Sequence, residues 1–335
     1  MSTLSSANRT LPNPGKKTGM QKLLSMMWQQ RYLYLLVIPG MASLILFSYV
    51  PIYGIQLAFK TYKVNLGIWG SPWNDFAHFE RIFSDPDFWS VTQNTLIISL
   101  MKILTGFPVP IILALLLNEV RGTVFKRVSQ TILYLPNFIS WIVIASLIYG
   151  LFSTQVGVYG KVFAALANDS GWIGSVFRGL FGTKATPILG NPDFFRAELY
   201  LSSIWKGAGA GMIIYLAAIS GVDPQLYESA QLDGAGRFKM MWHITLPALS
   251  FAITLNLIMA FGGVMNGNFD QIFNLYSPTV YKVGDTIDTF VYRMGIVGGR
   301  YDISTAVNLF KSVISAILLF GSDRVAKLLG QDGFF

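Results

Sequence analysis

The stretch "LYESAQLDGAGRFKMMWHITLP", residues 226–247, decides the fold because it places a compact polar insert between two apolar runs. The insert holds acidic side chains, basic side chains and a histidine. The flanking runs, Leu199–Ser220 and Ala248–Phe269, contain Lys206 and no other charged residue. A polar segment between two runs of about 20 apolar residues is typical of a loop that joins two membrane spans.

Local signals predict an elbow of two short helices in this insert. Asp223 can accept hydrogen bonds from free backbone N–H groups, and Pro224 suits the first helical position. Gly234 and Gly236 can end the first helix with left-handed backbone angles, and a second short helix is expected to stop at Pro247. The residues alone leave two interpretations open, a docking elbow for a partner protein and a helix lying on lipid headgroups.

The composition indicates a membrane protein. Of 335 residues, 53% are hydrophobic and 13% are charged, against about 25% charged in soluble domains. The chain has no cysteine and two histidines, so neither a disulfide nor a metal centre is expected. The net charge of +8 is explained by membrane topology and does not require a nucleic-acid partner.

Long apolar runs predict an all-α polytopic membrane protein with six transmembrane helices over residues 32–320. The predicted spans are Tyr32–Phe59, Phe88–Leu117, Val128–Phe152, Leu199–Ser220, Ala248–Phe269 and Ile303–Phe320. Lys102, Lys206 and Lys311 are the charged residues within them.

The distribution of basic residues predicts the orientation. Residues 1–31 are polar and basic, which indicates a cytoplasmic N-terminal tail. With this end inside, the inner segments carry more Lys and Arg than Asp and Glu, and the outer segments do not. We therefore expect a multi-pass protein of the cytoplasmic membrane with both termini inside, a cytoplasmic loop over 221–247 and a C-terminal tail over 321–335.

The insert resembles the EAA signature of permease subunits of binding-protein-dependent ABC importers: E-A-A, three residues, G, nine residues, I-x-L-P. The matching residues are Glu228, Ala230, Gly234, Ile244, Leu246 and Pro247, while Ser229 replaces the middle alanine. "YVPIYGIQLAFKTY" (residues 49–62), "YLPNFISW" (134–141) and "FDQIFNLYSPTVYKVGDTIDTFVYRMGI" (269–296) are similar to the LplB-like carbohydrate permeases, a subgroup that includes alginate-type uronate systems.

The resemblance implies a type I ABC importer permease fold and a set of partners. The insert would be the coupling helix that sits in a cleft of a cytoplasmic ATPase dimer. One such loop implies half of the translocation pathway, so a second, related but distinct permease subunit and an extracytoplasmic sugar-binding protein are expected. This chain would bind no cofactor, because ATP and Mg²⁺ would be used by the ATPase. The residues expected to couple are Glu228, Ser229, Ala230, Asp233, Gly234, Ala235, Ile244, Leu246 and Pro247.

Substrate contacts are predicted in and beside the fourth and fifth spans, because sugars are held by aromatic faces and hydrogen-bonding side chains. The candidates are Trp205, Asn256, Asn266, Asn268, Asp270, Gln271 and Tyr276. Each could instead serve as a capping, packing or loop residue. Lys102, Lys206 and Lys311 are costly in a bilayer and should face a partner or water. One hypothesis is contact with an acidic oligosaccharide of uronate type, and the other is snorkelling or pairing within the transporter.

The outer loops Lys60–Asp87 and Ser153–Glu198 are expected to meet the binding protein, although lipid contact by Trp73, Phe76 and Trp172 would leave the same pattern. A secondary transporter is the alternative, since it too would have spans interrupted by Pro and Gly. An enzyme is not expected, because the spans lack paired acids, and the chain has no G-x-x-x-x-G-K-[ST] phosphate loop.

Overall fold

The computed structural model describes residues 28–330 and residue 333. The predicted N-terminal tail therefore lies almost entirely outside the described residues, as do most of the last five positions. The chain divides into two compact units, residues 1–56 and residues 57–335.

The α-helix α2 (Arg31–Leu44) continues into a π-helical turn, η1 (Ile45–Tyr49), and then into the 3-10 helix η2 (Val50–Phe59), which begins in the first unit and ends in the second. Pro39 lies inside α2. The continuous segment Arg31–Phe59 is long and apolar enough to cross a membrane, as predicted from the sequence.

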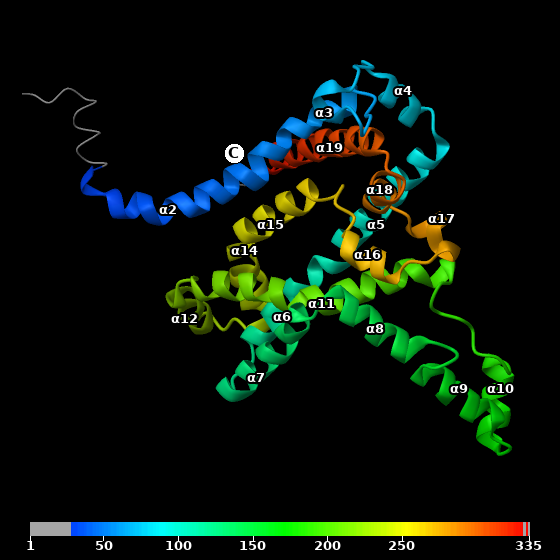
Figure 1. Cartoon of the computed structure of the whole chain (residues 1–335). Helices are drawn as coiled ribbons and strands as arrows, with labels where there is room; N and C mark the ends of the chain where they lie inside the picture. Colours follow the sequence, from blue (N-terminus) through cyan, green and yellow to red (C-terminus); the bar gives the residue numbers. More distant parts are fainter. Residues whose placement is uncertain (1–27, 331–332, 334–335) are drawn as a thin grey trace, which may run out of the picture. The chain divides into compact units, whose positions relative to one another are not determined.

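The second unit is built around the helix α11 (Pro192–Ser220), which packs against α5 (Pro86–Gly106), α6 (Pro108–Asn118) and α7 (Thr123–Tyr134) (Figure 1). The side chain of Asn191 caps α11 by accepting from the backbone N–H of Asp193 at 3.0 Å. Gly209 permits the close approach of α7, because a Cβ at this position would lie 2.0 Å from the carbonyl oxygen of Leu133.

Shorter helices surround this bundle. They are α3 (Gly67–Gly70), α4 (Ala77–Phe83), η3 (Leu135–Phe138), α8 (Trp141–Phe152), α9 (Val158–Asn168), α10 (Trp172–Phe181), α16 (Phe269–Leu275), η5 (Pro278–Val280), α17 (Tyr281–Gly284), α18 (Ile287–Val291) and η6 (Tyr292–Val297). The helix α15 (Ser250–Gly262) lies side by side with α19 (Tyr301–Leu328) (Figure 1).

The predicted all-α class is confirmed. Within the described residues the regular structure is helical, and the one exception is an isolated bridge between Lys60 and Trp73. Four helices are long and apolar enough to cross a membrane: Arg31–Phe59, Pro86–Asn118, Pro192–Ser220 and Tyr301–Leu328. Two bent helix pairs bring the number to as many as six if each pair is one span.

The third predicted span, Val128–Phe152, is sharply bent in the structure. Thr123–Phe138 and Trp141–Phe152 meet at 100°. Pro136 lies in the short 3-10 helix η3, and Ile139 has extended backbone angles, so the helical hydrogen-bond ladder stops there. Ser140 then caps α8 by accepting from the backbone N–H of Val143 at 3.4 Å.

The other boundaries also differ from the prediction. The helix of the fifth apolar run ends at Gly262, seven residues before the expected end at Phe269. Gly262 and Gly263 are poor helix formers, and the chain then turns through Asn268, whose left-handed φ of 54° precedes α16. The last helix continues past the expected boundary at Phe320 to Leu328. No helix end therefore marks the predicted start of the C-terminal tail.

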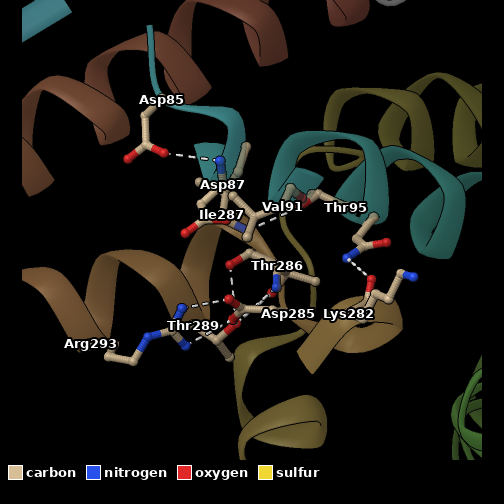
Figure 2. A network of polar contacts seen from close by, with 11 residues as sticks. Asp85, Asp87, Val91, Thr95, Lys282, Asp285, Thr286, Ile287, Thr289 and Arg293 are labelled. Atoms are coloured by element: carbon tan, nitrogen blue, oxygen red, sulfur yellow. Dashed lines mark hydrogen bonds and ion pairs between the residues drawn. The ribbon is translucent and has the colours of Figure 1, made fainter. Parts of the chain in front are cut away.

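A buried polar network fixes the segment between α17 and η6 (Figure 2). The Asp285 carboxylate accepts from the guanidinium of Arg293 at 3.1 and 2.5 Å and from the Thr289 hydroxyl at 2.7 Å. The hydroxyl of Thr95 on α5 accepts from the backbone N–H of Ile287 at 2.9 Å. This network ties α18 to the long helix α5.

Candidate functional site

The polar insert forms the predicted first helix, α12 (Pro224–Leu232). The Asp223 carboxylate accepts from the backbone N–H of Gln225 at 2.9 Å, and Pro224 occupies the first turn. Gly234 ends the helix with a left-handed φ of +76°, and the backbone N–H of Ala235 donates to the carbonyl oxygen of Ala230 at 2.9 Å. These three features confirm the predicted start and end of the helix.

Two details of the predicted elbow were wrong. Gly236 has a φ of −72° and an extended conformation, so it begins the next helix, α13 (Arg237–Met240), and does not contribute a left-handed turn. Pro247 does not end the second helix, because the chain continues helically through η4 (Met241–Thr245) and α14 (Leu246–Ala248) and bends by 56° only before α15. The wider π-helical turn η4 precedes the proline, whose ring would clash with a regular helical turn.

A side-chain contact joins the two helical parts of the elbow, and the acidic residues of the elbow face outward. The Tyr227 hydroxyl lies 3.0 Å from the Thr245 hydroxyl, which is buried. Glu228, Ser229 and Asp233 are exposed. The remaining predicted coupling residues are exposed or partly buried: Ala230, Gly234, Ala235, Ile244, Leu246 and Pro247. The arrangement gives a partner protein a firm, outward-facing helix, and the roles of these residues stay predictions.

A second candidate site is a polar pocket of about 270 Å³ at the break after α15. It is lined by Trp141, Asn266, Asn268, Phe269, Asp270 and Asp288. The Asp288 carboxylate shapes it by accepting from the backbone N–H of Gly267 at 3.0 Å. An indole face beside amides and carboxylates is a combination that can hold a sugar ring. We call this the amide pocket.

All three lysines of the predicted spans have partners within the chain. Lys311 forms an ion pair with Asp288. Lys102 donates to the side-chain carbonyl of Gln271 at 2.5 Å. These contacts match the interpretation of pairing within the transporter, and contact with substrate stays a prediction.

Lys206 occupies the bend of the third predicted span. Its Nζ donates to the carbonyl oxygen of Asn137 at 3.0 Å and to that of Ile139, and it lies 5.6 Å from the centre of the Trp141 ring. Lys206 and Lys311 therefore contact residues of the amide pocket wall, because Trp141 and Asp288 line the pocket. Lys102 contacts Gln271, which does not line it.

The remaining predicted substrate residues lie elsewhere. The Gln271 amide is buried and donates to the Leu199 carbonyl at 2.7 Å and to the Ser202 hydroxyl at 2.9 Å. Asn256 donates to the Ala252 carbonyl of its own helix at 2.8 Å. The rings of Tyr276 and Tyr281 pack 5.0 Å apart, and Trp205 lines a separate, apolar cavity.

Sequence reasoning missed three residues of the amide pocket, Trp141, Phe269 and Asp288. Trp141 ends the "YLPNFISW" stretch and directly follows the cap of α8, in the middle of the third predicted span. Asp288 lies in a predicted outer segment, where an acidic residue is common and does not indicate a substrate site. In the part of the chain that the structure describes, no group of three or more His, Asp or Glu side chains could hold a metal ion.

Comparison with known proteins decides the family. Residues 106–332 match the model of the binding-protein-dependent transport system inner membrane component. The chain belongs to this family. It is therefore a membrane component of a binding-protein-dependent transport system. The resemblance of its insert to the EAA signature agrees with this membership.

Two relatives from Bacillus subtilis (strain 168) are similar over nearly their whole length. Protein LplB is 42% identical over 307 residues, which cover 92% of each chain. The polygalacturonan/rhamnogalacturonan transport system permease protein YteP is 41% identical over 320 residues, which cover 96% of this chain and 95% of the relative.

Two solved structures share the fold. One is a crystal structure of a bacterial ABC transporter involved in the import of the acidic polysaccharide alginate, with a TM-score of 0.80, 34% identity and coverage of 92% of this chain and 100% of the matched chain. The other is a bacterial alginate ABC transporter in complex with an alginate pentasaccharide-bound periplasmic protein, with the same TM-score and identity and coverage of 93% and 99%. These matches confirm the predicted type I importer permease fold.

Proposed function

We propose that this chain is one permease subunit of an ABC importer for acidic oligosaccharides of uronate type, and that it forms half of the translocation pathway. The amide pocket carries the proposal, because an indole face, two amides and two nearby lysines, Lys206 and Lys311, lie at one break in a membrane helix. Helix breaks that line a cavity are where transporters place their substrate sites.

The comparisons support an acidic cargo. One relative, at 41% identity, is a polygalacturonan/rhamnogalacturonan transport system permease protein, and both similar structures are of alginate ABC transporters. All three are polymers that contain sugar acids. The Lys311 and Asp288 pair sits at the pocket wall, where a substrate carboxylate could compete with Asp288 for the ammonium group.

The partners follow from the energetics of import. The sequence contains no phosphate-binding loop of the G-x-x-x-x-G-K-[ST] type, so ATP with Mg²⁺ is hydrolysed by a separate ATPase dimer and this subunit is not an enzyme. The exposed helix α12 docks on that ATPase, a distinct second permease completes the pathway, and an extracytoplasmic binding protein delivers the sugar. Both termini and the loop 221–247 face the cytoplasm. Family membership leaves the alternative of a secondary transporter without support.

The test is ATP hydrolysis by the complete importer in lipid nanodiscs, with binding protein and pairs of oligosaccharides of equal length. Galacturonate trimers are compared with galactose trimers, which differ in the carboxylate. We expect stimulation by the acidic trimer alone. Stimulation by the neutral trimer alone would overturn the acidic cargo, and failure of any ATPase to assemble with the chain would overturn the proposal as a whole.

The same assay tests the amide pocket. Asn266 is exposed in the pocket, and Asn274 on α16 donates to the Asp270 carbonyl and lies outside the pocket. We expect Asn266→Ala to raise the concentration of acidic trimer needed for half-maximal uptake about tenfold, since one hydrogen bond to a charged or polar substrate is lost. Asn274→Ala is the matched control. Equal behaviour of both variants would remove the pocket from the pathway.

A further inference from the structure

An apolar groove between α8 and α11 contains one unpaired carboxylate. The groove has a volume of about 440 Å³ and is lined by aliphatic and aromatic side chains, among them Ile144, Leu151, Leu201 and Trp205. Glu198 also lines it, and its Oε1 is buried without a hydrogen-bond partner among the described residues. An unpaired carboxylate oxygen in apolar surroundings costs free energy, so we expect a partner from outside the chain to bind it.

The position of Glu198 along the spanning helix places it at the boundary between the hydrocarbon core and the headgroups. It directly precedes the apolar run Leu199–Ser220, whose 22 residues rise about 33 Å along α11. The hydrocarbon core is about 30 Å thick, so this run spans the core and Glu198 lies at its edge. Trp205 lies two turns further into the membrane along the same groove.

We propose that the groove binds one phosphatidylethanolamine molecule of the bilayer, with its ammonium group on Glu198 and an acyl chain along Leu201 and Trp205. The bilayer is the medium around this spanning helix, and the groove lining is apolar except at its headgroup end. An ammonium group supplies both the charge and the N–H donors that the Glu198 carboxylate lacks.

The chemistry of Glu198 selects this headgroup over the other common ones. A choline headgroup is cationic but carries no N–H group, so it cannot donate a hydrogen bond to the carboxylate. The headgroup of phosphatidylglycerol carries a net negative charge, so the carboxylate repels it. The proposal therefore predicts selectivity by hydrogen-bond donation and not by charge alone.

The first experiment counts lipids retained by the purified importer, by mass spectrometry after extraction. We expect Glu198→Gln to lower retained phosphatidylethanolamine about tenfold, as for the loss of one charge-assisted hydrogen bond, and to leave phosphatidylglycerol unchanged. Glu80→Gln, at an exposed carboxylate of α4, is the control. Ala197→Phe, which fills the groove but keeps the carboxylate, should also lower retention. Equal retention by the wild type and Glu198→Gln would overturn the proposal.

A second measurement needs no variant at Glu198. The wild-type importer should show a higher midpoint of thermal unfolding with phosphatidylethanolamine than with phosphatidylcholine of the same acyl chains, and no difference between them would contradict the proposal. The chain contains no cysteine, so Ala197→Cys introduces one defined thiol. Cross-linking of this thiol to a second permease chain would show that the groove is a subunit interface and that the proposal is wrong.

Discussion

Lys206 and Asn137 are joined across the bend of the third predicted span: the lysine Nζ donates to the asparagine carbonyl oxygen at 3.0 Å. A second bond runs from the same Nζ to the carbonyl oxygen of Ile139. The break in the helix leaves these carbonyl groups without helical partners. A positive charge at the C-terminal end of a helix is also favoured by the helix dipole. Lys206 therefore acts as a cap at this bend.

Replacement of Lys206 by methionine should therefore destabilise the protein whatever its substrate. The change leaves two carbonyl groups unpaired, and we expect a loss of about 2 kcal/mol. Lys184→Met, at an exposed position, is the control and should be neutral. Thermal unfolding of the purified protein checks this result. An unchanged unfolding midpoint together with weaker uptake of acidic substrate alone would assign Lys206 to substrate binding instead.

Two glycines of the "GAGAG" stretch should respond differently to alanine. A Cβ on Gly209 would lie 2.0 Å from the backbone carbonyl oxygen of Leu133, whereas a Cβ on Gly207 would meet no atom within 4 Å. We expect Gly209→Ala to push α7 away from α11 and to reduce the yield of folded protein severalfold. Gly207→Ala should be neutral or stabilising by up to about 1 kcal/mol, because alanine favours helix. Size-exclusion profiles of both variants provide the measurement, and identical profiles would contradict this packing.

The ion pair of Lys311 and Asp288 should show strong coupling. Both side chains are largely buried, and removing one partner of a buried pair costs about 3 kcal/mol because the other charge is left alone. We expect Lys311→Met to be more destabilising than the double change Lys311→Met and Asp288→Asn. A double-mutant cycle on thermal unfolding measures this difference. Additive effects would mean that the pair does not form.

Arg293 should be needed to keep the buried Asp285 in place (Figure 2). The hydrogen bond with Asp285 raises the pKa of Arg293, so the guanidinium stays charged at any pH that the protein survives. We expect Arg293→Met to cost about 2 kcal/mol, since Asp285 is buried and Arg293 is partly exposed. Arg293→Lys should recover only part of this loss, because lysine cannot form the paired contacts. Full recovery by lysine, seen in thermal unfolding, would contradict the bidentate arrangement.

Local chemistry made much of the elbow predictable, and long-range packing made the rest unpredictable. Asp223, Pro224 and Gly234 act on backbone groups within a few residues, so their roles follow from the sequence. The break at Pro136 is likewise a local effect, but the packing of the bent segment involves Lys206 and Gly209, which lie about 70 residues further along the chain. The amide pocket depends on Trp141 and Asp288, which meet only after the fifth run breaks at Gly262.

We propose that the elbow at Gly234 transmits the movement of the ATPase to the membrane helices. Gly234 has a φ of +76° and Gly236 a φ of −72°, and a Cβ at either position would meet no atom within 4 Å. Serine at position 234 must bear about 1–2 kcal/mol of backbone strain, whereas serine at position 236 is a favoured helix cap. The two variants are thus matched in side chain and surroundings and differ in backbone angle.

The most direct measurement is uptake of acidic oligosaccharide per ATP hydrolysed in proteoliposomes that contain the complete importer. We expect Gly234→Ser to lower the amount of sugar imported per ATP severalfold, and Gly236→Ser to keep the wild-type ratio. If both variants import sugar and hydrolyse ATP as the wild type does, the elbow does not couple the ATPase to transport.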